Sequence, residues 1–344
     1  MSAPLLAVTD LSVAFRTDEG EVTAVDRVSF SVSPGEVLGI VGESGSGKSV
    51  SALAVMGLLP KPGGRVTSGE ILFEGEDLLK LSERRMRAIR GRRIGMIFQE
   101  PMTSLNPVFT IGDQIAETIV HHERIGLAAA RERAVDMLAR VGIPSARKRL
   151  DDYPHQLSGG MRQRVMIAIA LACSPRLLLA DEPTTALDVT IQAQLLDLLR
   201  DLQAEFGMAV LVITHNMGVI AEFADRVCVF YAGRIAEAAP AEALFDRPSH
   251  PYTRGLLAST PEMAGDTARL RTISGMLPSI ASPPPGCRFA PRCDWMIPAC
   301  DAGRPPLAPV GAGHVAACIR AAEVAAEVAA EPAAEPAAVG TDAA

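Results

Sequence analysis

One short stretch of this 344-residue sequence combines the residue types that bind phosphate. "GESGSGKS", at 42–49, follows the apolar run "VLGIV" and precedes the helical pattern "VSALAVMGLL". Glycines let backbone N–H groups point at a phosphate where a helix begins, Lys48 neutralises the β- and γ-phosphates, and the Ser49 hydroxyl ligates Mg²⁺. The stretch therefore predicts a nucleoside triphosphate site. Its predicted members are Gly42, Glu43, Ser44, Gly45, Ser46, Gly47, Lys48, Ser49 and Val50.

A second stretch, "LLLADEP" at 177–183, ends an apolar run with two carboxylates. If the run is a strand, Asp181 lies at the sheet edge where Mg²⁺ and its water ligands sit. Glu182 follows and can orient and deprotonate an attacking water as a general base. An Asp–Glu pair can also serve as a helix N-cap, but beside a phosphate loop it favours nucleotide hydrolysis.

Four of the six cysteines lie in a loop-rich segment near the C-terminal end. In a reducing compartment, clustered thiols indicate a metal site rather than disulfides. The spacing C-x5-C-x6-C-x17-C fits neither the paired C-x2-C units of zinc modules nor the usual ferredoxin runs. Cys173 and Cys228 are expected to be core residues of a helix and a strand. The four clustered residues are Cys287, Cys293, Cys300 and Cys318.

Patterns of apolar residues predict the elements that position these groups. Residues 11–32 alternate as half-buried strands do, whereas "VLGIV", "IGMIF", "LLLA", "AVLVIT" and "VCVFY" are short continuous runs typical of strands covered on both faces. Helical patterns lie between them, as at 189–207, and residues 112–172 contain several helical stretches without a convincing strand. Strands alternating with helices predict an α/β fold with a parallel sheet.

Composition bounds the class of protein. The apolar runs are far shorter than the roughly 18 residues of a membrane-spanning helix, and no signal peptide is recognisable, so we expect a cytosolic chain. Residues 321–344 carry −5 of the net charge of −7, which leaves −2 for the body and no case for nucleic-acid binding. "RRMRAIRGRR", at 84–93, is expected to be a solvated face; the alternative is contact with lipid headgroups or an acidic partner.

A further motif narrows the class of nucleotide-binding protein. "LSGGMRQRV", at 157–165, resembles the signature sequence of ATP-binding-cassette (ABC) ATPases, and other cassette motifs follow in that family's order. Gln99 resembles the Q-loop residue that contacts Mg²⁺, Asp188 the D-loop, His215 the switch histidine and Phe15 the aromatic residue that stacks on adenine. The signature residues carried over are Ser158, Gly159, Gly160 and Gln163.

The resemblance implies a mechanism and an assembly. Residues 158–160 open an apolar helix, so that their N–H groups form a second anion site. In the family this site faces a second cassette, so ATP is sandwiched only when two cassettes dock head to tail, with Glu182 and His215 as the catalytic pair. Mg²⁺ would be held through Ser49, Gln99 and Asp181. The implied functional unit is a dimer.

The C-terminal region has a resemblance of its own. "SHPYTRGLL" and "PGCRFAPRC", at 249–257 and 285–293, are similar to the C-terminal region of ATPases from dipeptide and oligopeptide ABC importers, a branch that includes nickel and glutathione members. There the four cysteines can hold a 4Fe–4S cluster. Zinc and free thiols remain alternatives. The implied partners are a second, distinct ATPase subunit, two permease subunits and an extracytoplasmic binding protein, at the cytoplasmic face of the inner membrane.

We therefore expect a P-loop NTPase fold with an N-terminal antiparallel β subdomain, a parallel-sheet core, a helical subdomain and a small cysteine-containing C-terminal domain. The predicted boundaries are 1–255 for the cassette, with its helical part at about 100–172, 256–320 for the C-terminal domain, and 321–344 for a disordered tail. The predicted function is ATP hydrolysis that powers import of di- or oligopeptides. Rivals are another small cargo, or a soluble ABC ATPase acting on nucleic acid or ribosomes.

Overall fold

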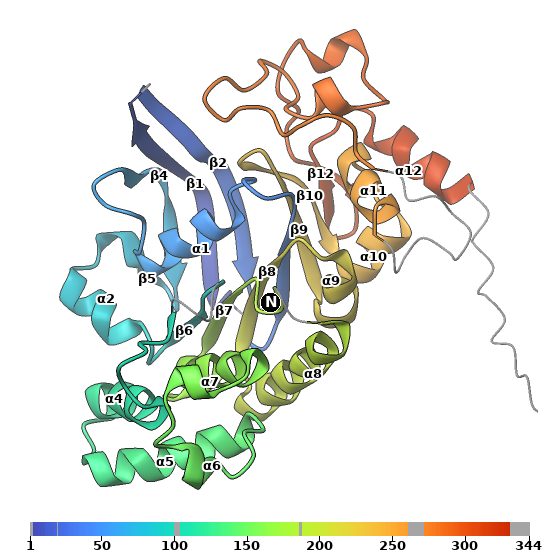
Figure 1. The fold of residues 1–344 in the computed structure, drawn as a ribbon. Helices are drawn as coiled ribbons and strands as arrows, with labels where there is room; N and C mark the ends of the chain where they lie inside the picture. Colours follow the sequence, from blue (N-terminus) through green and yellow to red (C-terminus); the bar gives the residue numbers. More distant parts are fainter. Residues whose placement is uncertain (1–2, 19, 100–103, 186–187, 261–271, 331–344) are drawn as a thin grey trace, which may run out of the picture.

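The computed structural model describes residues 3–18, 20–99, 104–185, 188–260 and 272–330, and it contains two β-sheets (Figure 1). The smaller sheet is antiparallel, in the order β2-β1-β4-β5. Alternating apolar residues face its core, where Val8 pairs with Phe30 and Val13 with Val25. Its strands are β1 (Leu6–Thr17), β2 (Gly20–Val32), β4 (Gly64–Phe73) and β5 (Glu76–Asp77).

The larger sheet has eight strands in the order β11-β12-β10-β9-β3-β8-β7-β6, of which the last five are parallel. Both faces of these five strands are buried, which explains why they read as continuous apolar runs. The predicted α/β fold with a parallel core is confirmed. The parallel strands are β9 (Arg226–Tyr231), β3 (Val37–Val41), β8 (Ala209–Thr214), β7 (Leu177–Asp181) and β6 (Ile94–Ile97).

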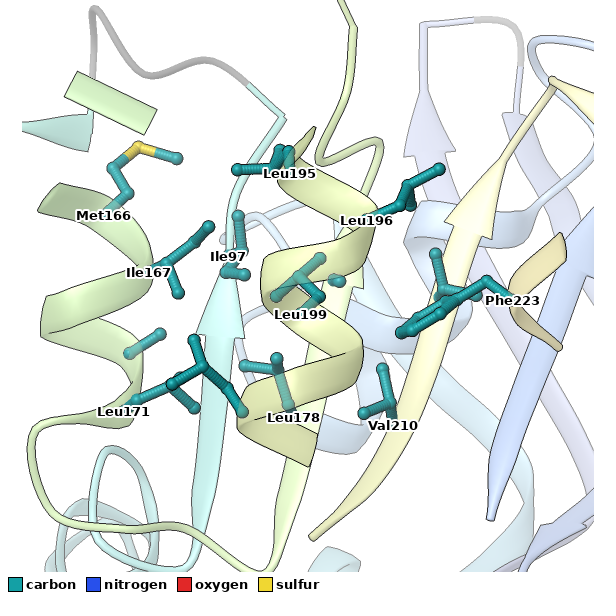
Figure 2. Close-up of a cluster of buried hydrophobic side chains, with 14 of the residues drawn as sticks. Ile97, Met166, Ile167, Leu171, Leu178, Leu195, Leu196, Leu199, Val210 and Phe223 are labelled. Atoms are coloured by element: carbon teal, nitrogen blue, oxygen red, sulfur yellow. The ribbon is translucent and has the colours of Figure 1, made fainter. Parts of the chain in front are cut away.

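Helices cover the two faces of the parallel strands. Figure 2 shows one side, where Ile167 of α7 and Leu199 of α8 face Ile97 and Leu178 of the sheet, all with no exposed surface. Residues from α1 join the other core, beneath the small sheet. The helices involved are α1 (Lys48–Met56), α7 (Gly159–Leu171), α8 (Val189–Phe206) and α9 (Met217–Phe223).

Between β6 and β7 the described part of the chain is helical. Thr110 caps the first helix by accepting a hydrogen bond from the Asp113 N–H, and an apolar stripe on each helix packs on its neighbours. The elements are α4 (Ile111–Glu123), α5 (Leu127–Arg140), α6 (Ala146–Arg149), the 3₁₀ turn η2 (Pro154–Gln156) and α7.

The arginine-rich stretch before β6 contains α2 (Glu83–Ile89), which follows the 3₁₀ turn η1 (Leu78–Lys80). Its arginines pair with carboxylates of the same surface: Arg90 with Glu83, and Arg93 with Glu74. These pairs support the interpretation of the stretch as a solvated, salt-bridged face.

The C-terminal region extends the large sheet rather than standing apart from it. β10 (Arg234–Pro240) pairs with β12 (His314–Ala316), which pairs with β11 (Ala308–Gly311). Thus residues beyond 300 complete a sheet that begins in the cassette. The helical elements here are α10 (Ala241–Asp246), α11 (Pro251–Ala258), which runs across the boundary predicted at 255, and the 3₁₀ turns η3 (Ala290–Arg292) and η4 (Pro298–Cys300).

Part of the C-terminal tail, expected to be disordered or transiently helical, is helical in the structure. Residues 321–330 form α12 (Ala321–Ala330). Val324 is fully buried and Glu327 pairs with Arg254, so this part of the tail packs on α11 instead of remaining free. The rest of the predicted tail lies outside the described residues. No helix among the residues described is long and apolar enough to span a membrane.

Candidate functional site

The phosphate loop connects β3 to α1 and has the backbone shape that its glycines predict. Gly42 and Gly47 have φ values of 147° and 100°, and a Cβ at Gly42 would lie 2.1 Å from the Phe230 carbonyl oxygen. Lys48 Nζ donates to the carbonyls of Gly42 and Glu43 at 2.7 and 3.0 Å. Burial lowers the pKa of Lys48, and nearby carboxylates partly offset this. The loop thus holds a buried amine beside a helix N-terminus, as an anion site requires.

Neighbouring strands bring the predicted carboxylate and histidine to the same edge. β3 lies next to β8 and β8 next to β7, all parallel, so their carboxyl ends meet. There the Ser49 hydroxyl donates to Asp181 Oδ1 at 2.9 Å. Burial raises the pKa of Asp181, with a further contribution from the charge of Glu182 and opposition from Ser49. The two predicted ligands of Mg²⁺ are therefore adjacent.

Glu182 is the centre of a polar cluster. Its carboxylate accepts hydrogen bonds from Gln99 Nε2 at 3.1 Å and Thr185 Oγ1 at 2.8 Å, and lies 3.2 Å from His215 Nδ1. Its backbone has a φ of 48°, a left-handed conformation of the kind stored at functional sites. Burial by itself raises the pKa of Glu182, but hydrogen bonds with Thr185 and His215 bring it below its usual value. The carboxylate is therefore ionised near neutral pH and able to accept a proton.

The structure thus brings the predicted catalytic pair together. The amide of Gln99, predicted to contact Mg²⁺, donates to Glu182 in this structure. The role of Thr185 was missed by sequence reasoning. The signal was present, since a hydroxyl three residues after a candidate base on a turn lies within reach of its carboxylate.

The signature residues lie on the surface at the start of α7. Ser158 caps the helix by accepting a hydrogen bond from the Met161 N–H. Gly159 is exposed, and a Cβ there would meet no atom within 4 Å. Gln163 is different, because it is only 2% exposed and its Nε2 donates to the Pro183 carbonyl at 2.6 Å. Instead of facing a second chain, Gln163 ties α7 to the loop that carries Glu182.

The remaining predicted site residues surround this edge. Phe15 is half-buried on β1, and Val50 is half-buried on α1. Asp188 caps α8 by accepting from the Ile191 N–H at 2.9 Å. The two residues before it, 186 and 187 of the predicted D-loop, lie outside the described residues.

The four C-terminal cysteines line one small cavity together with apolar groups that include Phe289 and Trp295. Burial raises the pKa of Cys293 to about 12 and raises those of Cys287 and Cys318, so these three thiols stay protonated near neutral pH in the absence of a cation. Within the ranges that the structure describes, no group of three or more His, Cys, Asp or Glu side chains is arranged to hold a metal ion. Cys173 and Cys228 are buried in the cassette, as predicted.

Comparison with known sequences agrees with this geometry. The ABC transporter family matches residues 25–185, and the oligopeptide/dipeptide transporter C-terminal region matches residues 236–300. A "Putative peptide import ATP-binding protein" of Brucella melitensis is 53% identical over 332 residues, 93% of this chain and 98% of that protein. A "Probable peptide ABC transporter ATP-binding protein" of Sinorhizobium fredii is 54% identical over 321 residues, 93% and 96% of the two chains.

Solved structures give the same result for the cassette. A dimeric ATP-binding cassette in a post-hydrolysis state, bound to ADP and Pi, aligns with a TM-score of 0.62 and 28% identity, over 69% of this chain and 98% of that one. The cbiO1 protein of Clostridium perfringens, part of an ABC transporter complex, aligns with a TM-score of 0.60 and 27% identity, over 71% and 91%. The chain belongs to the ATP-hydrolysing cassettes of ABC transporters, in the branch that carries the oligopeptide/dipeptide transporter C-terminal region.

Proposed function

We propose that this chain is the ATP-hydrolysing subunit that powers import of di- or oligopeptides through two permease subunits at the cytoplasmic face of the inner membrane. Two close relatives carry peptide transport in their names, and each aligns over more than nine-tenths of its length. The observation that carries the catalytic part is the cluster of Glu182, His215 and Gln99 at the carboxyl edge of the sheet, beside the phosphate loop.

The geometry assigns a role to each group. Lys48 neutralises charge on the β- and γ-phosphates, while Ser49 and Asp181 would hold Mg²⁺, which supplies further charge neutralisation. Glu182 accepts a proton from water as the water oxygen bonds to the γ-phosphorus and the bond to the β–γ bridging oxygen breaks. The hydrogen bonds of Glu182 to Thr185 and His215 orient its carboxylate for this transfer.

A second cassette would complete the site. The supporting observation is the open space at Gly159, on the exposed N-terminus of a 13-residue helix whose first N–H groups suit an anion. In this branch we favour a distinct ATPase as the partner, with a second copy of this chain as the alternative. Mass measurement of a Glu182→Gln variant with ATP, alone and mixed with a candidate partner ATPase of the same family, distinguishes the two.

The Gly159→Ala variant tests this docking directly. Because nothing lies within 4 Å of the added Cβ, the single chain should fold and bind ATP as before. Hydrolysis by the complex should fall at least tenfold, because the methyl group blocks approach of the partner's γ-phosphate. Gly126→Ala, also in open space but at the start of α5, is the matched control. Unchanged hydrolysis in Gly159→Ala would refute docking at this helix.

The four C-terminal thiols would hold a 4Fe–4S cluster, with zinc as the alternative. All four thiols line one small cavity and so lie near one another in the fold, which supports a shared metal group. Backbone N–H groups hydrogen-bond to the sulfurs of Cys287, Cys293 and Cys318, and that of Arg320 donates to Cys318 Sγ at 3.4 Å. Such hydrogen bonds stabilise bound thiolates. The role of the bound metal group would be to cross-link a segment with few buried apolar groups.

Protein purified without oxygen tests this assignment by counts of iron, zinc and acid-labile sulfide per chain. We expect about four irons and four sulfides, lost in Cys293→Ser and retained in Cys173→Ser, whose thiol lies in the cassette. One zinc per chain would favour the zinc site over the iron–sulfur cluster. Absence of both metals would overturn the metal site.

Cargo is tested in the reconstituted complex with its permease subunits and binding protein. Di- and oligopeptides should stimulate ATP hydrolysis and accumulate inside vesicles. Stimulation by Ni²⁺ or glutathione and not by peptides would transfer the assignment to that cargo. Salt-sensitive binding of the isolated chain to nucleic acid would instead favour the soluble alternative.

A further inference from the structure

One residue of the phosphate loop, Glu43, is held by groups from two regions of the chain. Its carbonyl accepts hydrogen bonds from Lys48 Nζ at 3.0 Å and from the Ser46 N–H at 3.2 Å, both within the loop. Its N–H donates to Tyr252 Oη at 2.9 Å, and its carboxylate accepts from Arg292 Nη1 at 2.8 Å. Tyr252 and Arg292 come from the C-terminal region, more than 200 residues away, so that region directly holds the loop.

Tyr252 is a rigid support. It has no exposed surface, and its ring packs against Tyr231 and Phe289 with centroid distances of 4.5 and 5.4 Å. Phe289 in turn packs edge-on against Tyr231 at 5.2 Å. The hydroxyl therefore has little freedom to follow the Glu43 N–H if the loop moves. A partly buried N–H without an acceptor is unfavourable, so the loop conformation shown here is favoured.

Arg292 is held equally firmly. Its side chain is only 6% exposed, its Nε donates to the Ser274 carbonyl at 2.8 Å, and its guanidinium lies over the Tyr231 ring at 5.8 Å. Carbonyls of the C-terminal region therefore hold Nε and Nη2, while Nη1 donates to the Glu43 carboxylate and, at 3.4 Å, to Tyr231 Oη. A charge-assisted hydrogen bond with one partner this well buried is stronger than a surface ion pair.

Arg292 and the ring that supports Tyr252 both lie beside the clustered cysteines. Phe289, which supports Tyr252, lies two residues after Cys287, and Arg292 immediately precedes Cys293. The turn between these cysteines is closed by the Ala290 N–H bond to the Cys287 carbonyl and the Cys293 N–H bond to the Ala290 carbonyl. A change in the packing of this turn therefore moves the groups that hold Glu43.

We propose that Tyr252 and Arg292 are positioning residues of the phosphate loop, through which ATP binding and the order of the cysteine-bearing segment 286–300 affect one another. They act on ATP only through Glu43. The proposal rests on the ATP site and stands whether the cysteines hold iron–sulfur, zinc or nothing. Its failure and that of the metal assignment are therefore separate outcomes.

Tyr252→Phe is the sharpest single test, because it removes one oxygen, keeps the ring and changes no charge. The Glu43 N–H then lacks its acceptor, and the Kd for Mg²⁺-ATP on the full chain should rise about tenfold. KM should rise with it, while kcat at saturating ATP changes less than about threefold, since the hydrolytic cluster is untouched. A Kd within twofold of wild type, in a variant with an unchanged melting temperature, refutes the role of Tyr252.

A double-mutant cycle separates a contact through Glu43 from a general effect of positive charge. Arg292→Ala should weaken ATP binding about tenfold in wild type and less than about twofold in the Glu43→Gln background. Equal weakening in both backgrounds would mean that Arg292 acts on the phosphates at long range or through folding, and would refute the proposal. Arg292→Lys, which keeps the charge and a donor, should restore binding if Arg292→Ala is poorly folded.

Arg304→Gln is the matched control for both variants. Arg304 lies in the same C-terminal region and pairs with Asp26 of the cassette at 3.2 Å, but it does not contact the phosphate loop. Its loss should leave the Kd for ATP within twofold of wild type. A tenfold effect here would show that any loosening of the region weakens ATP binding and would overturn the specific roles of Tyr252 and Arg292.

Coupling must also run in the opposite direction. Amide hydrogen exchange in residues 286–300 should slow several-fold when Mg²⁺-ATP saturates the wild-type chain. In the Tyr252→Phe, Glu43→Gln double variant, saturated at higher ATP concentration, this protection should disappear. Exchange in 286–300 that is unaffected by ATP in wild type would overturn the coupling, even if the binding results above were obtained.

Discussion

The ATP site and the cysteine-bearing segment are built in different ways. The groups of the ATP site sit at the ends of parallel strands whose side chains are buried on both faces, so Asp181 and the loop at 42–49 are placed by a continuous core. Between residues 286 and 320 the regular elements are two 3₁₀ turns and two short strands, and Leu307 and Ile319 remain exposed.

Ion pairs to the cassette hold that segment together with a few buried groups such as Phe289, which joins the cassette core. Arg288 and Arg304 bind Asp26, and Arg292 binds Glu43. The comparison shows that buried apolar layers beneath the ATP site can hold its groups in place. A segment with few buried apolar side chains depends more on contacts with its neighbours. The predictions below test this contrast.

Loss of the proposed catalytic carboxylate should have the largest effect. Glu182→Gln keeps the shape of the side chain but removes the proton acceptor, so hydrolysis should fall by about 10²–10⁴ while ATP still binds and holds the dimer closed. Steady-state phosphate release and ATP binding measure the two properties. Glu205→Gln, on the surface of α8, is the control and should hydrolyse normally. Normal turnover in Glu182→Gln would remove Glu182 from the mechanism.

Replacing a leucine by alanine in each region compares how much buried apolar packing contributes to stability there. Leu199→Ala, in the fully buried layer of Figure 2, should lower the free energy of unfolding by about 2–5 kcal/mol. Leu307 is 40% exposed, and Leu307→Ala should cost under about 1 kcal/mol. Denaturant titration followed by intrinsic fluorescence and circular dichroism gives both values. Similar costs at the two positions would contradict the proposed contrast.

Mild acid should loosen the C-terminal region through His250. This histidine is buried, its Nδ1 accepts from the Tyr252 N–H at 3.0 Å, and burial lowers its pKa to about 4 despite the nearby Glu237 carboxylate. Above its unfolded pKa of about 6.5 the contribution to stability is complete. As pH falls from 6.5 to 4 the unfolded chain binds the proton first, so up to about 3 kcal/mol is lost.

Other groups titrate in the same range, so the difference between wild type and His250→Asn isolates this one. Asparagine keeps an acceptor for the N–H but has no charge to gain. If wild type has the higher melting temperature at pH 7, the melting temperatures of wild type and His250→Asn should converge as the pH is lowered to 4.5. A constant difference across this range would show that His250 is not the titrating group.

The smallest effect is expected where the segment meets the cassette at the surface. Arg304 is 39% exposed and shares Asp26 with three other arginines, Arg27, Arg234 and Arg288, so Arg304→Gln should lower stability by under about 1 kcal/mol. Arg288 binds the same carboxylate but is only 7% exposed, so Arg288→Gln should cost several times more. Equal effects would mean that burial does not set the strength of these edge contacts.

Much of the ATP site could be predicted because its residues are close in sequence to the strands that place them. The loop after β3, the carboxylates after β7 and His215 after β8 each follow an apolar run, and parallel strands must bring such ends together. The cap that Asp188 provides for α8 was not predicted, since the sequence assigned Asp188 only to the D-loop. What failed was the orientation of side chains on such elements, as with Gln163, since a motif does not tell which face of a helix is buried.

By itself, the sequence determined the α/β class, the order of the cassette elements and the edge where ATP is hydrolysed. Only the tertiary structure decided that β12 extends the cassette sheet, that residues 321–330 pack as a helix, and that Tyr252 and Arg292 hold Glu43. The physical reason is the distance along the chain over which each kind of interaction acts. Periodicity and turn residues act over a few positions, whereas contacts across more than 200 residues depend on which surfaces the folded sheet brings together.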